Sequence, residues 1–165
     1  MRYFKWLAIE AKIFNVGEDR RTESPNPNAE FFSPTNPAGA ASRQAAAQHA
    51  LEDMMRWFSE TDGTIAIFDA TNSTRERRQW IEDSCAQHNV QTMYVESLCG
   101  KEDLIMSNIL EVKTSSPDYV GMSPEEAARD FRERIRNYER VYETIDGGAG
   151  SVNGEGKGGG EGTEK

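Results

Sequence analysis

Short apolar runs alternate with amphipathic stretches along most of the chain, a pattern typical of domains built from βαβ units. The runs 64–68 (TIAIF) and 92–95 (TMYV) are continuously apolar, as expected of buried parallel strands. A third strand is predicted at 12–16 (KIFNV). Helices are predicted at 40–59, 73–88, 101–112 and from 124 onward. The pattern therefore predicts an α/β fold with a mainly parallel sheet.

Apolar stripes and capping signals support the predicted helices. In 40–59, one face carries residues at helical spacing, namely Arg43, Ala47, Leu51, Met54 and Phe58. The last helix carries apolar positions in steps of three and four at Ala128, Phe131, Ile135, Tyr138, Tyr142 and Ile145. Two capping boxes are expected, one from Ser73 to Glu76 and one from Ser123 to Glu126. Four prolines predict a long loop at 22–39.

Composition changes sharply near the C-terminus. Residues 147–165 hold 9 of the 14 glycines and only one branched apolar residue, Val152. Such a segment cannot bury enough surface to offset its ordering entropy, so we expect a disordered glycine-rich tail. The remaining 1–146 form the expected folded domain.

Charge and cysteine content limit the class of protein further. Nineteen Lys and Arg against 28 Asp and Glu give a net charge of −9. This argues against a nucleic-acid binder that relies on an overall basic surface, although a local basic pocket is compatible with it. No window approaches the ~18 consecutive apolar residues of a membrane span, so no membrane partner is expected. Two cysteines form no disulfide framework, which favours a reducing, cytoplasmic setting.

The first candidate for chemistry is Asp69, which directly follows the run 64–68. Ligands of open α/β sheets bind beyond the carboxyl ends of the strands, where a Walker B carboxylate holds Mg²⁺. The alternative is that Asp69 only ends the strand or caps the turn. Cys99 follows the run 92–95 at the same kind of position; packing is its alternative role, and Cys85 is expected in the core.

Several cations lie where predicted elements begin or end. The start of the helix after Asp69 carries Arg75, Arg77 and Arg78, and helix N-termini attract anions. The alternative for Arg75 and Arg78 is a solvated helix face. Arg134 and Tyr138 share one side of the last helix. Further cations at element ends are Arg20, Arg21, Arg43 and Lys113. Together these positions predict a pocket for an anionic ligand on an acidic protein.

These residues lie in segments that resemble the kinase domain of the 6-phosphofructo-2-kinase/fructose-2,6-bisphosphatase family over nearly all of 2–146. The segments, in order, are FNVGEDRR (14–21), EFFSPTN (30–36), FDATNSTRERR (68–78), VESLC (95–99), VKTSSPDYV (112–120) and RERIRNYERVYETID (132–146). The resemblance implies a three-layer P-loop kinase-like fold. It also implies transfer of the γ-phosphoryl group of ATP to the 2-hydroxyl of fructose 6-phosphate, with Mg²⁺ as cofactor.

The resemblance also implies roles for individual residues. Those matching fructose 6-phosphate contacts are Arg20, Arg43, Thr71, Arg77, Lys113, Arg134 and Tyr138. Asp69 matches the active-site aspartate and metal-site carboxylate, and Cys99 matches the cysteine beside it. Residues matching a stretch that contacts the nucleotide are Asn108, Ile109, Leu110, Glu111, Val112 and Lys113. The family also allows a homodimer of the parent protein.

The sequence departs from the family pattern at both ends. The family's first strand and its G-x-x-x-x-G-K-[ST] loop are expected before the first residues, and that motif occurs nowhere in the 165 residues. After Asp146 the glycine-rich tail replaces the bisphosphatase, so no phosphatase activity is expected. We therefore expect a kinase-domain fragment that is weak or inactive alone. Two alternatives stay open: a non-catalytic sugar-phosphate-binding or kinase-partner protein, and a half-enzyme complemented by another chain.

Overall fold

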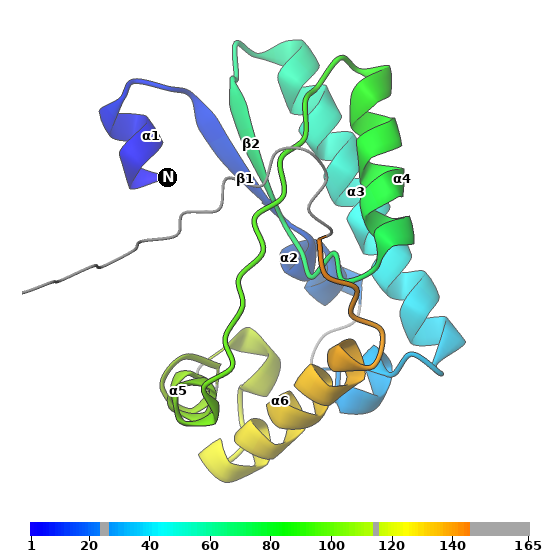
Figure 1. Cartoon of the computed structure of the whole chain (residues 1–165), viewed down its shortest axis with the longest axis vertical. Coiled ribbons are helices and arrows are strands. Elements are labelled where there is room, and N and C mark those ends of the chain that lie inside the picture. Colours follow the sequence, from blue (N-terminus) through cyan, green and yellow to red (C-terminus); the bar gives the residue numbers. More distant parts are fainter. Residues whose placement is uncertain (24–26, 114–115, 146–165) are drawn as a thin grey trace, which may run out of the picture.

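The computed structural model describes residues 1–23, 27–113 and 116–145. Figure 1 shows strands and long helices in its upper part and further helices below the carboxyl ends of the strands. The predicted tail at 147–165 lies outside the described residues. No helix in the described ranges is long and apolar enough to cross a membrane.

The sheet consists of two parallel strands, β1 (Ala11–Asn15) and β2 (Ile65–Asp69). Both lie within one residue of the predicted strands, so the α/β fold with a parallel sheet is confirmed. Parallel strands need a crossover connection. Here the crossover contains helix α2 (Val16–Glu23), the 3₁₀ turn η1 (Ala29–Phe32) and helix α3 (Pro37–Glu60). The expected loop at 22–39 thus contains the end of α2, η1 and the start of α3.

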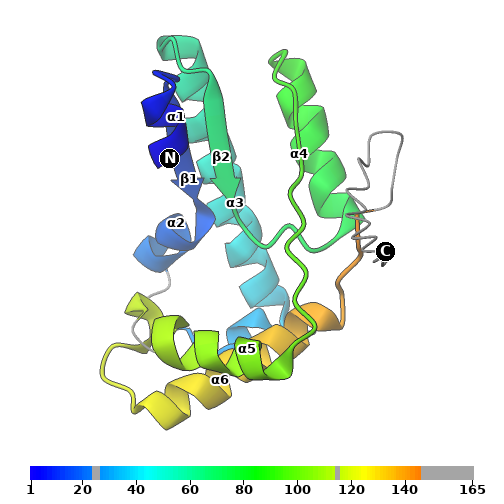
Figure 2. The ribbon, with the colours of Figure 1, turned by 60° about the vertical axis from the view of Figure 1, so that its left-hand side comes forward.

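Helix α3 packs along the sheet, and helix α4 (Arg75–Gln87) follows β2 (Figure 2). Asn36 caps α3, because its side chain accepts a hydrogen bond from Gly39 N at 2.9 Å. Thr74 caps α4 by accepting from Arg77 N at 3.2 Å. The predicted capping box at Ser73 is therefore wrong: the Ser73 carbonyl accepts from Glu143 N, and the helix starts after it.

The second half of the chain contains helix α5 (Glu102–Asn108), the π-helical turn η2 (Ile109–Lys113), the 3₁₀ turn η3 (Pro117–Tyr119) and helix α6 (Pro124–Glu139). The capping box of Ser123 and Glu126 at the start of α6 is confirmed. Helix α6 ends at Glu139, so the expectation that it carries Tyr142 and Ile145 is wrong. Both residues lie in an extended segment that bonds to Glu96 instead.

The predicted strand at 92–95 is also wrong. The chain between α4 and α5 runs as a long extended trace, with Met93 86% and Val95 83% exposed (Figure 1). A strand is stable when a neighbour pairs with its backbone groups, and no strand in the described ranges pairs with this segment. Its apolar character alone therefore did not make it a strand.

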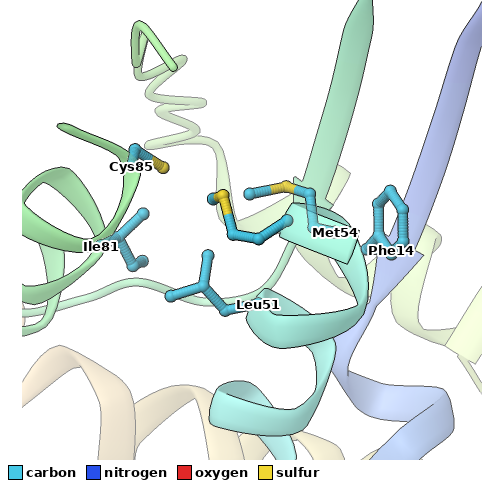
Figure 3. Close-up of a cluster of buried hydrophobic side chains, with 6 residues drawn as sticks. Phe14, Leu51, Met54, Ile81 and Cys85 are labelled. Carbon is cyan, nitrogen blue, oxygen red and sulfur yellow. The ribbon is translucent and has the colours of Figure 1, made fainter. Parts of the chain in front are cut away.

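The main core lies between the sheet, α3 and α4 (Figure 3). Its buried side chains are Phe14, Leu51, Met54, Met55, Ile81 and Cys85. The apolar stripe predicted for α3 supplies Leu51 and Met54, and the expected burial of Cys85 is confirmed. A second cluster packs α2 against the first half of α3 through small side chains, namely Val16, Ala46, Ala47 and Ala50. This close packing fixes α2 next to the carboxyl end of β1.

Replacing Leu51 with Ala tests this core. Leu51 is 4% exposed, so the substitution leaves a cavity between α3 and α4 and should lower the free energy of unfolding by about 2–5 kcal/mol. The matched control is Leu98→Ala, because Leu98 is 73% exposed and its truncation should cost less than about 0.5 kcal/mol. Urea denaturation followed by circular dichroism measures both. Equal losses in the two variants would contradict the assigned core.

Candidate functional site

The carboxyl ends of the two strands are joined by Asn15 and Asp69, which are directly opposite in the sheet. Asn15 Nδ2 donates to Asp69 Oδ2 at 3.1 Å. Asn15 Oδ1 accepts from Gly17 N at 2.9 Å and from Glu18 N at 3.3 Å. Asn15 therefore links the Asp69 carboxylate to the first turn of α2. Asp69 is exposed, as a ligand-binding carboxylate must be.

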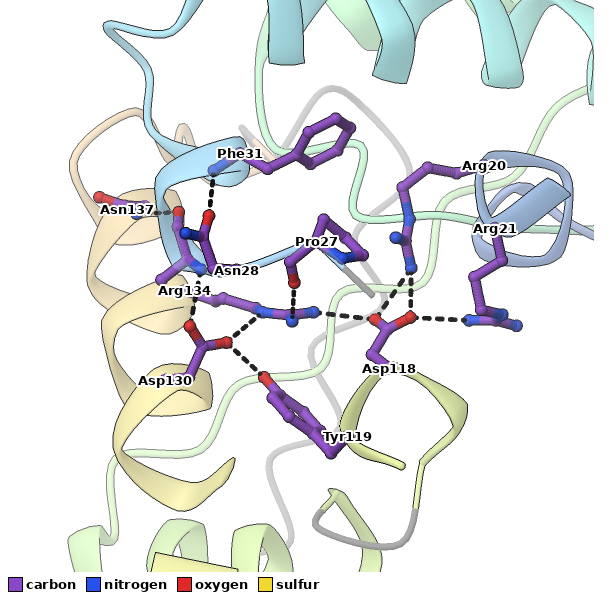
Figure 4. A network of polar contacts seen from close by, with 11 residues as sticks. Arg20, Arg21, Pro27, Asn28, Phe31, Asp118, Tyr119, Asp130, Arg134 and Asn137 are labelled. Atoms are coloured by element: carbon purple, nitrogen blue, oxygen red, sulfur yellow. Dashed lines mark hydrogen bonds and ion pairs between the residues drawn. The ribbon is translucent and has the colours of Figure 1, made fainter. Parts of the chain in front are cut away.

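A carboxylate in η3, Asp118, connects α2 to α6 through two arginines (Figure 4). Arg20 Nη2 donates to both Asp118 oxygens, at 2.8 and 2.9 Å, and Arg134 Nη1 donates to Asp118 Oδ2 at 2.8 Å. Arg21 Nη1 lies 3.9 Å from Asp118 Oδ1. The side chains of Arg20 and Arg134 are each 6% exposed and that of Asp118 is 10% exposed. The network is therefore largely desolvated, where hydrogen bonds between charged groups are strong.

Burial raises the pKa of Asp118, but the hydrogen bonds and positive charges of Arg20 and Arg134 outweigh it and hold that pKa below its ordinary value. The carboxylate is therefore ionised at neutral pH.

Arg134 is also bonded to its own helix and to the segment before η1. Its Nε donates to Asp130 Oδ2 at 2.9 Å, and its Nη2 donates to Pro27 O at 2.5 Å. Asp130 accepts two further hydrogen bonds, from Tyr119 Oη at 2.9 Å and from Ala29 N at 2.7 Å. Burial raises the pKa of Tyr119, which keeps the phenol a neutral donor. These contacts fasten η1 and η3 to α6 (Figure 4).

The Phe32 ring stands at the centre of the predicted substrate residues. Cation–ring distances are 4.4 Å for Arg134, 5.5 Å for Arg20 and 5.9 Å for Arg43, within the range of favourable cation–π contacts. The Tyr138 ring lies 6.1 Å from the Phe32 ring. Four residues predicted to contact the same ligand, from α2, α3 and α6, therefore surround one buried aromatic side chain.

Arg43 and Arg77 differ from the two buried arginines because neither forms an ion pair with a carboxylate of the described residues. Arg43 donates to the Phe31 carbonyl, and Arg77 donates to Gln44 and lies 4.7 Å from the Trp80 ring. Partial burial lowers the pKa of both guanidiniums. Arg77 bonds to Gln44, the residue next to Arg43, and Arg43 lies against the Phe32 ring that Tyr138 also contacts. Neither positive charge is neutralised by a carboxylate of the described residues.

The other predicted site residues lie outside this cluster. Thr71 is exposed in the loop between β2 and α4, and Cys99 is exposed in the segment before α5. The predicted nucleotide stretch forms the end of α5 and the turn η2. Within it Asn108, Leu110 and Glu111 are exposed, whereas Ile109 is 2% exposed. The side chains of Val112 and Lys113 lie outside the described part of the structure.

The sequence did not indicate four residues that build the cluster, namely Phe32, Asp118, Tyr119 and Asp130. Asp130 carries a usable signal, because it lies four residues before Arg134 on one helix face. Asp118 lies in the family-like segment 112–120, but no local spacing links it to its partner Arg20, which is 98 residues away in sequence.

Two surface hollows are lined by none of the predicted site residues. One, of about 760 Å³, has Met106 on one wall and residues of α6 on another, among them Asp130 of the cluster. The other, of about 550 Å³, lies between α3 and α4. The predicted substrate arginines therefore lie outside both hollows.

The fold and the cluster together define an α/β protein with a group of arginines at the carboxyl end of its sheet, and comparison with known proteins is more specific. Residues 1–152 match the 6-phosphofructo-2-kinase family, so the chain belongs to that family, as its motifs predicted.

Curated relatives agree with this assignment. The chain is 47% identical over 148 residues to a fructose-2,6-bisphosphatase of Saccharomyces cerevisiae. It is 41% identical over 152 residues to a 6-phosphofructo-2-kinase/fructose-2,6-bisphosphatase of Caenorhabditis elegans. It is 43% identical over 146 residues to 6-phosphofructo-2-kinase/fructose-2,6-bisphosphatase 4 of Homo sapiens. Each match covers 88% of this chain but only 31–33% of the relative. The chain thus spans about a third of the length of these relatives.

Asp118→Asn tests the buried network. The substitution leaves Arg20 and Arg134 with one carboxylate fewer in a desolvated position, and should lower the free energy of unfolding by about 3–5 kcal/mol at pH 7. The control is Glu133→Gln, because the Glu133–Arg136 pair on α6 is exposed and should contribute less than about 1 kcal/mol. Urea denaturation measures both changes. A loss at Asp118 no larger than at Glu133 would show that the network does not hold the site together.

A comparison of wild type with Asp118→Asn also gives a pH test. The folded pKa of Asp118 is below its ordinary value of 3.8, so the ionised carboxylate stabilises the fold above that value. This contribution is lost as pH falls through the folded pKa. The difference in unfolding free energy between wild type and Asp118→Asn should therefore be full at pH 6–7 and shrink below about pH 4. Urea titrations at several pH values measure it, and a difference that grows on acidification would contradict the assignment.

Proposed function

We propose that this chain is part of a 6-phosphofructo-2-kinase that transfers the γ-phosphoryl group of ATP to the 2-hydroxyl of fructose 6-phosphate in the cytoplasm. Its described residues would form the sugar-phosphate half of the site. The observation that carries the proposal is the position of Arg43 and Arg77, two partly buried arginines without a carboxylate partner among the described residues. Arg77 bonds to Gln44, next to Arg43, and Arg43 shares the Phe32 ring with Tyr138. Guanidinium groups in such a setting favour a phosphate dianion, because it satisfies their charge and donors together.

In this proposal the predicted substrate residues have two different tasks. Arg43 and Arg77 bind the 6-phosphate, and the Tyr138 hydroxyl adds a hydrogen-bonding group. Arg20 and Arg134 are each bonded to Asp118, so they hold η1, η3 and α6 in place. They also supply positive charge beneath the proposed phosphate site. Thr71 and Lys113 are assigned to the sugar from the family resemblance alone.

Asp69 fits a Mg²⁺ site in part. It is an exposed carboxylate at the carboxyl end of β2, and Mg²⁺ typically takes one or two carboxylates together with phosphate oxygens and water. No group of three or more potential protein ligands occurs among the described residues, so nucleotide and water would complete the coordination. Bound MgATP would supply the phosphoryl group and neutralise its charge. Asp69 and the Asn15 amide would orient that end of the site.

The nucleotide-binding half of the proposed site differs from the sugar-phosphate half, because its expected phosphate-binding motif does not occur in this sequence. The 165 residues contain no G-x-x-x-x-G-K-[ST] loop, whose backbone amides and lysine normally hold the β- and γ-phosphates. This observation favours a second candidate function for the chain by itself, a sugar-phosphate-binding protein without turnover. The 108–113 stretch and Cys99 are assigned to nucleotide contact and catalysis from the family resemblance only.

Thermal denaturation of the full chain with and without fructose 6-phosphate tests the proposal. Saturating ligand should raise the melting temperature, since a ligand at 100 times its dissociation constant stabilises by about 2.7 kcal/mol. Arg43→Ala should abolish the ligand-induced rise by removing one phosphate contact and its charge. The ligand-induced rise in melting temperature of the variant is compared with that of wild type, so that any change in stability without ligand cancels.

Arg56→Ala is the matched control, because Arg56 lies on the same helix, is 58% exposed and pairs with Asp53. It should keep the full rise. Fructose without its phosphate should produce none. A rise that survives Arg43→Ala, or that fructose reproduces, would refute the proposed phosphate site. A kinase assay of the same protein with MgATP separates the two candidate functions.

A further inference from the structure

Arg78 is a buried arginine in the first turns of α4 that belongs to none of the assigned substrate contacts. Its exposed fraction is 8%, whereas Arg75 on the same helix is exposed. The alternative of a solvated helix face therefore fits Arg75 and is wrong for Arg78. A buried guanidinium requires compensating partners, so its contacts indicate what it does.

Those contacts join three segments that are separate in sequence. Arg78 Nη1 donates to the Asn72 carbonyl at 3.1 Å, and Nη2 donates to the Thr144 carbonyl at 3.3 Å. The carbonyl of Arg78 itself accepts from Tyr94 Oη at 2.7 Å. One residue thus connects the loop after β2, the segment before α5 and the segment after α6.

The loop after β2 needs such support. Asn72 has a φ of +41°, in the left-handed region that non-glycine residues seldom adopt, and its Oδ1 is buried without a partner in the described residues. An unfavourable backbone conformation persists only when its surroundings hold it. The Arg78 hydrogen bond fixes the carbonyl of this residue, and Thr74 begins the helix two residues later.

The segment 142–145 holds the same loop from the other side; we refer to it as the strap. Glu143 N donates to the Ser73 carbonyl at 2.9 Å, and Arg75 N donates to Glu143 Oε2 at 2.5 Å. Together with the Arg78 contact to Thr144, these bonds fix consecutive backbone groups from Asn72 to Arg75.

Glu96 anchors the strap. Its carboxylate accepts from Thr144 Oγ1 at 2.8 and 3.1 Å, from Ile145 N at 3.3 Å and from the Tyr142 hydroxyl. Glu96 and Arg78 therefore bind the strap at adjacent points, one from the segment before α5 and one from α4.

We propose that Arg78 is a positioning residue: with the strap, it holds the 69–74 loop in the one conformation in which Asp69 and Thr71 serve the sugar-phosphate site. This inference rests on the proposed function for the role of the loop. The mechanical part, that Arg78 and the strap order the loop, stands on the contacts alone. Arg78 touches no substrate residue and acts through the Asn72 carbonyl.

Hydrogen–deuterium exchange of the full chain tests the mechanical part, with Arg78→Lys as the main variant. A lysine keeps the charge but lacks the planar fork of two nitrogens with which Arg78 reaches the Asn72 and Thr144 carbonyls. Exchange within 72–75 should therefore accelerate about tenfold, the effect of losing one hydrogen bond from a charged donor; the reporting amide is that of Arg75, which donates to Glu143 Oε2. Amides in the centre of α3 should be unchanged. Arg75→Lys, an exposed position on the same helix, should leave 72–75 as in wild type.

Glu96→Ala provides a second variant that leaves α4 intact. It should accelerate the same amides, and its effect combined with Arg78→Lys should be less than additive, because both act through the strap. Unchanged exchange at 72–75 in either single variant would overturn the inference. So would a uniform acceleration that includes α3, since that would indicate global destabilisation alone.

Fructose 6-phosphate titration of the same proteins tests the link to the site. Arg78→Lys should weaken binding about tenfold while its urea midpoint stays near that of wild type, and Arg75→Lys should not weaken it. Unchanged affinity in Arg78→Lys would overturn the positioning role. If wild type itself binds no fructose 6-phosphate, the proposed function fails, and the exchange data still decide whether Arg78 orders the loop.

Discussion

The carboxylate of Asp118 lies between Arg20 and Arg134, and the arrangement of the candidate site depends on this contact. The three groups come from η3, α2 and α6, which are far apart in sequence, and all are largely removed from water. Buried charges are costly to desolvate, so removing the shared carboxylate takes from both arginines a partner that balances their charge. The contact therefore selects the arrangement in which η1, η3 and α6 close beneath the carboxyl ends of the strands.

This network also explains how a protein with a net charge of −9 can present the proposed site for an anion. Asp118 and Asp130 neutralise the buried arginines Arg20 and Arg134. Arg43 lies against the Phe32 ring and Arg77 against the Trp80 ring, and no described carboxylate pairs with them. The positive potential is therefore local, set by which arginines have carboxylate partners, and the overall charge has little bearing on it.

The sequence predicted those features that depend on local pattern. The runs at 12–16 and 64–68 form paired strands, and the stripe in α3 faces the core, because periodicity alone determines which side is buried. The prediction failed for 92–95, where apolar residues have no neighbouring strand. It also failed for Tyr142 and Ile145, whose helical spacing continues past the end of α6 while their backbone bonds to Glu96. Ser73 and Thr74 are adjacent hydroxyls, and only tertiary contacts decide which one caps α4. Long-range pairs such as Arg20 with Asp118 leave no mark in local sequence.

The most direct test of the account is an NMR titration of the full chain that follows the arginine side-chain Nε–Hε signals. Adding fructose 6-phosphate should shift the signals of Arg43 and Arg77 with one shared dissociation constant. The signals of Arg56 and Arg129, on exposed helix faces away from the cluster, should stay in place. If Arg43 and Arg77 do not respond, or if all exposed arginines shift equally, the arginine cluster is not a sugar-phosphate site.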